Sequence, residues 1–169
     1  GKYRKTHAAV DHYEGSPPWE HPRSGQPRDW MLRHDPEWIM EAGAEQKIPV
    51  IVLDRPNPNA HYVDGPILDK SLKSFVGMQP IPTVYGMTIG EYAKMLNEEG
   101  WLNQKLKCEL TIIPCLNYNH NMAYDLPVKP SPNLPNLRSI YLYPSLCYFE
   151  GTDVSLGRGT NKQFQVYGA

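Results

Sequence analysis

The sequence of 169 residues predicts an α/β fold, because helical segments are followed by short apolar strands. A helical segment at 36–46 precedes a β-branched run at 49–53. A second helix that starts near Thr88 precedes a second strand at 110–113. The run at 49–53 lacks the apolar and polar alternation of a half-exposed strand, and this is typical of a strand buried on both faces of a parallel sheet.

The first predicted helix has Asp35 as its N-cap and Pro36 as its first residue. Trp38, Ile39 and Ala42 recur at helical spacing, so we expect them to form its apolar face. Residues 1–35 show no sustained period of 2 or 3.6 and are left unassigned, mostly as loop. Such a start indicates missing sequence before it or an unusual insertion.

A polar turn, residues 54–59, follows the first strand and contains two prolines that prevent the strand from continuing. Open α/β sheets bind ligands beyond the carboxyl ends of their strands, so Asp54 and Arg55 stand where chemistry is usually found. The alternative is an internal Asp–Arg pair that only braces the turn. Both interpretations remain open.

A long connection at 60–87 is punctuated by proline and glycine, and few regular elements are expected in it. Thr88 and Glu91 then have the spacing of a capping box, and the apolar stripe that follows ends at Gly100. Glu91 is therefore predicted to cap the helix rather than to act in catalysis.

The predicted strand at 110–113 ends the first architectural unit, and residues 117–135 are predicted to be loop. A short helix around Leu137 to Tyr141 follows. A second short helix after Pro144 is expected to turn Leu146, Cys147 and Phe149 inward. Residues 164–167 are predicted to form a strand.

The composition excludes several classes of partner. A net charge of -1 provides no basic field for nucleic acid and no polybasic strip for a membrane surface. No apolar run approaches the roughly 20 residues that span a bilayer. The chain shows no targeting signal, so either the protein stays inside the cell or such a segment has been removed. Three cysteines without C-x-x-C spacing are interpreted as buried thiols, and scattered histidines predict no metal site and no cofactor.

Two charged residues near the C-terminus are candidates for chemistry. Glu150 follows an apolar run, and a buried carboxyl with a raised pKa suits a general acid in glycoside hydrolysis. The alternative is a structural carboxylate held by Arg158 or by backbone donors. Arg158 lies between two glycines, where a guanidinium can bind a carboxylate or phosphate, although an ordered turn explains it equally well.

The loops are rich in tyrosine, and aromatic rings among polar residues suit a carbohydrate cleft. No phosphate-binding loop, dinucleotide fingerprint or nucleophile elbow is present, so nucleotide binding and acyl transfer lack support. The tyrosines concerned are Tyr62, Tyr85, Tyr118, Tyr124, Tyr141 and Tyr143.

Several strings of residues from 37 to 169 resemble a bacterial family of exo-β-N-acetylmuramidases, especially members from Bacteroides-like bacteria. These are 51–58, 74–77, 85–88, 130–135, 143–152 and 157–160. The resemblance implies a Rossmann-like domain, of which 36–115 is the remaining C-terminal part, joined to a smaller α+β domain that starts at 116–169. It also implies a cleft between the two domains in which terminal N-acetylmuramic acid is released from peptidoglycan fragments.

By carry-over from the family, the resemblance implies a set of cleft residues. Its catalytic members are Glu150 and Asp54, and its substrate-binding members are Arg55, Asn57, Ser131, Asn133 and Arg158. The lactyl carboxylate of the substrate gives a physical reason for an arginine in the cleft.

The resemblance also implies a longer parent protein, periplasmic or secreted, with muramic-acid-containing glycans as partners. Relatives are more than twice as long, and Glu20-His21 is only a weak match here to their upstream Glu-His motif. We therefore expect that this chain is inactive alone, or that it is a non-catalytic glycan-binding or structural fragment.

Overall fold

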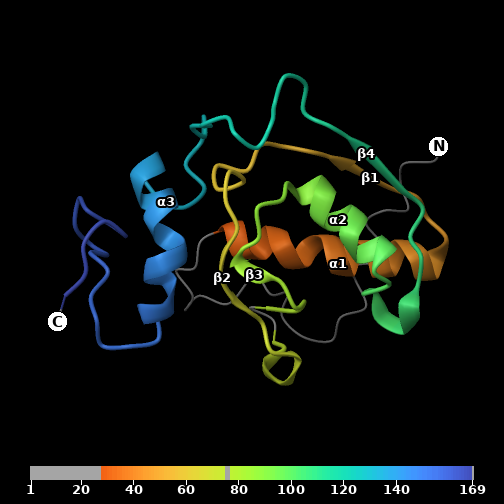
Figure 1. Cartoon of the computed structure of the whole chain (residues 1–169), viewed down its shortest axis with the longest axis horizontal. Helices are drawn as coiled ribbons and strands as arrows, with labels where there is room; N and C mark the ends of the chain where they lie inside the picture. The colour runs from red at the N-terminus through yellow and green to blue at the C-terminus, as the bar shows by residue number, and fades with distance from the viewer. Residues whose placement is uncertain (1–27, 75–76, 169) are drawn as a thin grey trace.

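The structure is a computed structural model that describes residues 28–74 and 77–168 (Figure 1). The predictions for residues 1–27, including the Glu20-His21 motif, lie outside the described residues. The elements follow in the order α1 (Arg28–Gln46), β1 (Val50–Leu53), β2 (Asp64–Ile67), η2 (Lys70–Leu72), β3 (Pro82–Val84), α2 (Ile89–Glu98), η3 (Asn103–Lys105), β4 (Leu110–Ile113), α3 (Leu137–Leu146) and η4 (Cys147–Phe149), where η denotes a 3-10 helix.

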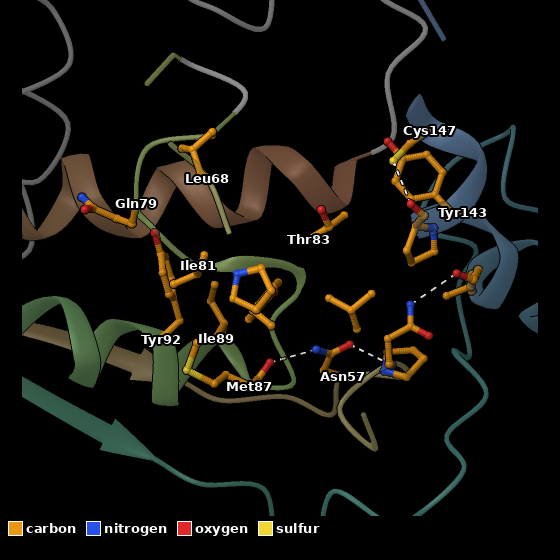
Figure 2. A pocket seen from close by; sticks show the side chains of 18 of the residues that line it. Asn57, Leu68, Gln79, Ile81, Thr83, Met87, Ile89, Tyr92, Tyr143 and Cys147 are labelled. Carbon is orange, nitrogen blue, oxygen red and sulfur yellow. Dashed lines mark hydrogen bonds between the residues drawn. The ribbon is translucent and has the colours of Figure 1, made fainter. Parts of the chain in front are cut away.

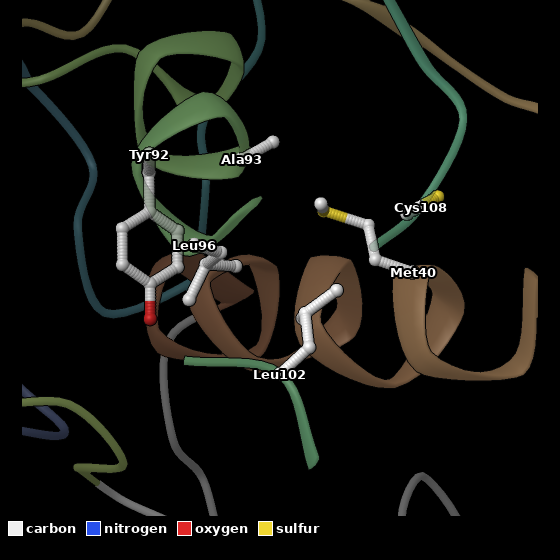
Figure 3. Close-up of a cluster of buried hydrophobic side chains, with 6 residues drawn as sticks. All are labelled: Met40, Tyr92, Ala93, Leu96, Leu102 and Cys108. Carbon is white, nitrogen blue, oxygen red and sulfur yellow. The ribbon is translucent and has the colours of Figure 1, made fainter. Parts of the chain in front are cut away.

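Strands β1 and β4 pair in parallel, with Val50 opposite Leu110 and Leu53 opposite Ile113, so both predicted strands are confirmed. Helices α1 and α2 lie beside each other below these strands in Figure 1. Their facing side chains and two residues of the segment between α2 and β4 form the first core, shown in Figure 3, which consists of Met40, Tyr92, Ala93, Leu96, Leu102 and Cys108. Helices that cover a parallel sheet confirm the α/β class.

The described elements cover only one face of the β1–β4 pair. Val50 and Val52 are half-buried against the first core, whereas Ile51 and Leu53 are 65% and 74% exposed. Successive side chains of a strand point to opposite faces, so this alternation follows directly from one-sided packing. The prediction that the first strand is buried on both faces is therefore wrong for the part of the chain described here.

Helix α1 differs from the predicted helix in its start and in its buried face. It begins at Arg28, so Pro36 lies inside it, and residues 28–35 are helix rather than loop. Glu37 and Met40 are buried, while Trp38 and Ile39 are 39% and 55% exposed. Packing against α2 selects the Glu37 and Met40 face, and the apolar spacing alone did not predict this.

Helix α2 is confirmed in detail. The Thr88 hydroxyl accepts a hydrogen bond from the Glu91 N–H at 3.2 Å, and the Glu91 carboxylate accepts one from the Thr88 N–H at 2.8 Å. Gly100 follows the helix with φ of +64°, the left-handed conformation that ends many helices. The predicted capping role of Glu91 is thus confirmed.

The connection at 60–87 contains a strand pair that the sequence did not predict. β2 and β3 pair antiparallel, with Asp64 opposite Val84 and Ile67 opposite Pro82. Every residue of β2 is exposed, so no apolar alternation marks it in the sequence.

The C-terminal part has its own core of Leu134, Ile140, Leu146, Leu156 and Phe164. One helix, α3, runs through Pro144 where two were predicted, and η4 follows it. Phe149 is 38% exposed, so its predicted inward position is wrong. The strand predicted at 164–167 is also wrong: Phe164 has φ of +51°, and only an isolated bridge joins Ser155 to Gly168.

No helix in the described part of the chain is long and apolar enough to span a bilayer. Among the same residues, no three His, Cys, Asp or Glu side chains are gathered closely enough to hold a metal ion. The three cysteines are free thiols, of which Cys108 is buried and Cys115 and Cys147 are half-buried.

Candidate active site

A cavity of about 860 Å³ lies between the helical layer and the C-terminal part (Figure 2). One wall includes the turn after β1, the β2–β3 pair and the start of α2, and the other includes α3 and η4. The segment at 126–130, with Lys129, also lines the cavity. Most of its lining is aliphatic. The polar and aromatic residues around it include Arg55, Asn57, Asn59, Gln79, Tyr85, Tyr143, Tyr148 and Glu150.

Three contacts hold the two walls together. The Asn59 amide donates a hydrogen bond to the Ile140 carbonyl at 3.3 Å. This carbonyl lacks its usual helical donor because Pro144, four residues later, has no N–H. The hydroxyls of Thr83 and Tyr148 also hydrogen-bond to each other across the cavity. The rings of His61 and Tyr141 pack edge to face, 5.6 Å apart.

The turn that carries Arg55 into the cavity is braced through Asn57. The Asn57 amide donates to the Met87 carbonyl at 2.8 Å and accepts from the Asn59 N–H at 2.9 Å. The Tyr118 hydroxyl accepts from the backbone N–H of Asn57 at 3.1 Å and donates to its carbonyl at 3.0 Å. Both polar atoms of the Asn57 side-chain amide, Nδ2 and Oδ1, therefore stabilise the turn. The residue also lines the cavity.

Asp54 does not line this cavity. Its carboxylate accepts hydrogen bonds from the Thr88 hydroxyl at 2.7 Å, the Gly90 N–H at 2.9 Å and the Arg55 N–H at 3.0 Å. Gly90 makes this approach possible, because a Cβ there would lie 2.9 Å from Asp54 Cγ and 2.7 Å from Ile112 Cγ2. Asp54 thus acts as an additional acceptor at the positive N-terminus of α2.

Arg55 contacts Asp54 through its backbone, so the anticipated Asp–Arg ion pair is not what braces the turn. Its side chain is exposed, lines the cavity and makes no ion pair with the described residues. A guanidinium in this position is able to bind an anionic group of a ligand.

Glu150 and Arg158 form an ion pair at 2.5 Å on the far side of the cavity. The Glu150 side chain is 15% exposed, and the Arg158 guanidinium also lies over the Phe164 ring, 5.3 Å from its centre. Glu150 lines the cavity, but Arg158 does not. The contact matches the alternative in which Arg158 holds Glu150, and it leaves the second oxygen, Oε1, without a hydrogen bond from the described residues.

The two glycines beside Arg158 have positive φ angles, +70° at Gly157 and +79° at Gly159. At Gly157 a Cβ would lie 2.5 Å from the Lys162 carbonyl oxygen, so the backbone of its own chain requires glycine there. At Gly159 nothing lies within 4 Å of such an atom. The glycines thus shape an ordered turn that presents Arg158 to Glu150.

Ser131 and Asn133 lie in a turn outside the cavity lining. Ser131 is buried, and its hydroxyl accepts from the Asn133 N–H at 3.2 Å. Of the predicted site residues, the structure brings Arg55, Asn57 and Glu150 to one cavity. Asp54, Ser131, Asn133 and Arg158 surround it without lining it.

The sequence did not reveal a buried carboxyl behind the cavity wall. Glu37 is 1% exposed and accepts hydrogen bonds from the Tyr92 hydroxyl and, at 3.1 Å, from the Gln79 amide. Burial raises the pKa of Glu37, and the two donors offset this only in part. Tyr92 and Gln79 both line the cavity. No local signal marks Glu37, because its partners lie 42 and 55 residues away.

Two family models match this chain. The model of the N-terminal region of the exo-beta-N-acetylmuramidase NamZ matches residues 36–138, and the model of the C-terminal region matches residues 141–169. The chain belongs to the NamZ family. Both matched regions line the cavity: α3 begins at the boundary between them, and η4 lies within the C-terminal match.

Relatives of known sequence or structure agree with this assignment. The chain is 44% identical over 137 residues to the peptidoglycan beta-N-acetylmuramidase NamZ of Bacillus subtilis (strain 168), covering 78% of this chain and 32% of the relative. Two crystal structures of DUF1343 family proteins from Bacteroides fragilis are similar. One has a TM-score of 0.81 and 55% identity, over 86% of this chain and 41% of that protein. The other has a TM-score of 0.70 and 34% identity, over 76% and 34%. The chain thus spans about a third of the length of its curated relative.

Proposed function

We propose that this chain is part of a glycoside hydrolase that releases terminal N-acetylmuramic acid from peptidoglycan-derived glycans. The observation that carries the proposal is the cavity between the two NamZ regions, with Arg55 on one wall and Glu150 on the other. Its volume of about 860 Å³ is within the usual range for ligand sites.

Arg55 is the residue that we propose for recognition of the lactyl carboxylate. This carboxylate distinguishes N-acetylmuramic acid from N-acetylglucosamine, and arginine binds carboxylates in a two-pronged geometry. Arg158 was the other candidate, but its guanidinium is occupied by Glu150 and Phe164. A substrate carboxylate at Arg158 would have to compete with Glu150.

Glu150 is the carboxylate that we propose for the reaction. Glycosidases place two carboxyl groups on either side of the bond that is cleaved, and one of them acts as acid or base. The acidic residues that line the cavity among those described are Asp69 and Glu150, and Asp69 accepts hydrogen bonds from Ser71. The catalytic role predicted for Asp54 stays a prediction, and the contacts of its carboxylate favour a structural role.

We also propose that β1 and β4 belong to a larger Rossmann-like sheet. Parallel sheets are ordinarily covered on both faces, and the exposed Ile51, Leu53 and Ile113 form an apolar face that suits a second layer. A cell-wall substrate supports the further proposal that the parent protein is periplasmic or secreted.

The alternative function is a glycan-binding fragment without catalysis. It is favoured because both carboxylates that line the cavity among the described residues already have partners, Glu150 with Arg158 and Asp69 with Ser71. Measuring turnover and binding on the same preparation separates the two functions.

The experiment uses a chromogenic β-glycoside of N-acetylmuramic acid to detect hydrolysis and calorimetry with N-acetylmuramic acid to detect binding. Release of the chromogenic group by the wild-type chain, and its loss in Glu150→Gln, supports the hydrolase. Glu98→Gln, a substitution at an exposed position, controls for the change of charge. Binding without release supports the glycan-binding alternative. A wild-type chain that neither binds N-acetylmuramic acid nor hydrolyses the glycoside would contradict both functions.

A further inference from the structure

A single tyrosine supplies both backbone hydrogen bonds of Asn57 in the turn after β1. The Tyr118 hydroxyl accepts from the Asn57 N–H at 3.1 Å and donates to the Asn57 carbonyl at 3.0 Å. The Asn57 side chain donates to the Met87 carbonyl (Figure 2) and accepts from the Asn59 N–H. All four hydrogen-bonding groups of Asn57 are therefore engaged, and Tyr118, 61 residues away in the chain, engages two of them.

Tyr118 acts on the turn from outside the cavity. Its side chain is half-buried and does not line the cavity, whereas Arg55 and Asn57 do. Burial raises the pKa of the Tyr118 hydroxyl above its ordinary value, so the hydroxyl keeps its proton and is able to donate and accept at once. A ligand in the cavity can therefore contact Arg55 without contacting Tyr118.

The segment that carries Tyr118, residues 117–124, is itself anchored to helix α2. The His120 Nε2 atom lies 3.0 and 2.9 Å from the two carboxylate oxygens of Glu91, in the first turn of that helix. The ring of Tyr118 packs beside those of His120 and Tyr124, with centres 6.4 and 6.5 Å away. These contacts fix the Tyr118 hydroxyl relative to the start of α2.

Two prolines connect the position of Asn57 to that of Arg55. Pro56 and Pro58 flank Asn57, and a proline ring holds its own φ at about -65°. Each proline also keeps the residue before it, Arg55 or Asn57, out of the helical conformation. On its other side, the Arg55 N–H donates to the Asp54 carboxylate at 3.0 Å. Few backbone torsions remain free between Asn57 and Arg55, so a shift of Asn57 also displaces Arg55.

We propose that Tyr118 is a positioning residue that holds the Arg55 guanidinium where it can bind the carboxylate of an anionic sugar. This inference rests on the proposed function, in which Arg55 recognises the lactyl carboxylate. A two-pronged contact between guanidinium and carboxylate is directional, so a small displacement of Arg55 weakens it. Tyr118 thereby contributes to selectivity for N-acetylmuramic acid over N-acetylglucosamine, which has no carboxylate.

The experiment compares Tyr118→Phe with the matched control Tyr124→Phe. Both variants lose one hydroxyl from a half-buried tyrosine of the 117–124 segment, but the Tyr124 hydroxyl has no hydrogen bond to a described residue. Tyr124 does not line the cavity either. Calorimetry measures the dissociation constants of N-acetylmuramic acid and of N-acetylglucosamine for both variants and for the wild-type chain.

We expect Tyr118→Phe to weaken binding of N-acetylmuramic acid about three- to tenfold, which corresponds to about one lost hydrogen bond. Binding of N-acetylglucosamine is expected to change by less than about twofold. Tyr124→Phe should leave both dissociation constants unchanged.

A double-mutant cycle with Arg55→Leu separates positioning from general destabilisation. If Tyr118 acts through Arg55, Tyr118→Phe causes no further loss of affinity in a protein that already carries Arg55→Leu, so the two losses are not additive. If circular dichroism shows that Tyr118→Phe does not fold, His120→Leu takes its place with the same expectation. It releases the 117–124 segment at a side chain that is 41% exposed.

The inference is overturned by unchanged binding in Tyr118→Phe, by an equal loss of affinity for both sugars, or by additive losses in the cycle. Each of these results leaves the proposed function standing, because the wild-type chain still binds N-acetylmuramic acid. If the wild-type chain does not bind N-acetylmuramic acid, the proposed function fails and the positioning role of Tyr118 fails with it.

Discussion

The carboxylate of Asp54 accepts a hydrogen bond from the Gly90 N–H at 2.9 Å, which ties the turn after β1 to the first turn of α2. The two residues are 36 positions apart in the chain. Because the Asp54 turn also carries Arg55, this contact links the stability of the fold to the position of a proposed substrate-binding residue.

Asp54→Ala is expected to lower the free energy of unfolding by about 1–3 kcal/mol, because the Thr88 hydroxyl and the Gly90 N–H at the start of α2, and the Arg55 N–H, lose their acceptor. Urea denaturation followed by circular dichroism measures the change. Asp64→Ala is the matched control, since the carboxylate of the exposed Asp64 accepts a hydrogen bond from the N–H of Gly65 and from no other described residue. Equal stability of the two variants would contradict the structural role of Asp54.

Gly90→Ala is expected to destabilise the fold by about 1–3 kcal/mol, the usual cost of an extra methyl group in a packed site. The new Cβ would lie 2.7 Å from Ile112 Cγ2 and 2.9 Å from Asp54 Cγ. Thermal unfolding of Gly151→Ala provides the comparison, because nothing lies within 4 Å of a Cβ at that position. A Gly90→Ala protein as stable as Gly151→Ala would show that the close approach is not real.

Glu37 predicts a dependence of stability on pH. Burial raises its folded-state pKa above the ordinary value of 4.5, so between these two values the folded protein binds the proton more strongly than the unfolded chain. The contribution of this proton to stability is fully present below pH 4.5 and is lost as the pH rises through the folded-state pKa.

We therefore expect wild-type protein to gain stability relative to Glu37→Gln as the pH falls from neutral toward 4.5. Urea denaturation of both proteins across this range measures the difference. Glu45→Gln, an exposed substitution on the same helix, controls for the loss of one charge. Parallel stability curves for wild type and Glu37→Gln would show that the Glu37 proton is not coupled to folding.

Arg55→Leu is expected to weaken binding of N-acetylmuramic acid by about 10- to 100-fold, the usual range for a charged hydrogen bond. N-acetylglucosamine lacks the lactyl carboxylate, so its weaker binding should not change. Calorimetry with both sugars gives the two affinities, and Arg138→Leu, an exposed arginine on α3, is the control. An equal loss of affinity for both sugars would mean that Arg55 shapes the turn rather than recognising the carboxylate.

Much of the local structure follows from short stretches of sequence. The capping box at Thr88 and Glu91, the stop at Gly100 and the strand at 110–113 were all predicted, because each depends on residues within one turn or one strand. The family could be recognised for a similar reason, since its motifs are contiguous strings. The candidate site was predicted in part: Arg55, Asn57 and Glu150 do meet at one cavity.

Tertiary structure decided what depends on distant partners. Packing of α1 on α2 buried Glu37 and exposed Trp38, because Tyr92 and Gln79 supply donors that no pattern within α1 indicates. The N-terminus of α2 took both oxygens of Asp54, and Arg158 took one oxygen of Glu150. A side chain's hydrogen-bonding partners are set by the fold, so its residue type and spacing alone do not reveal whether it is left to meet a ligand.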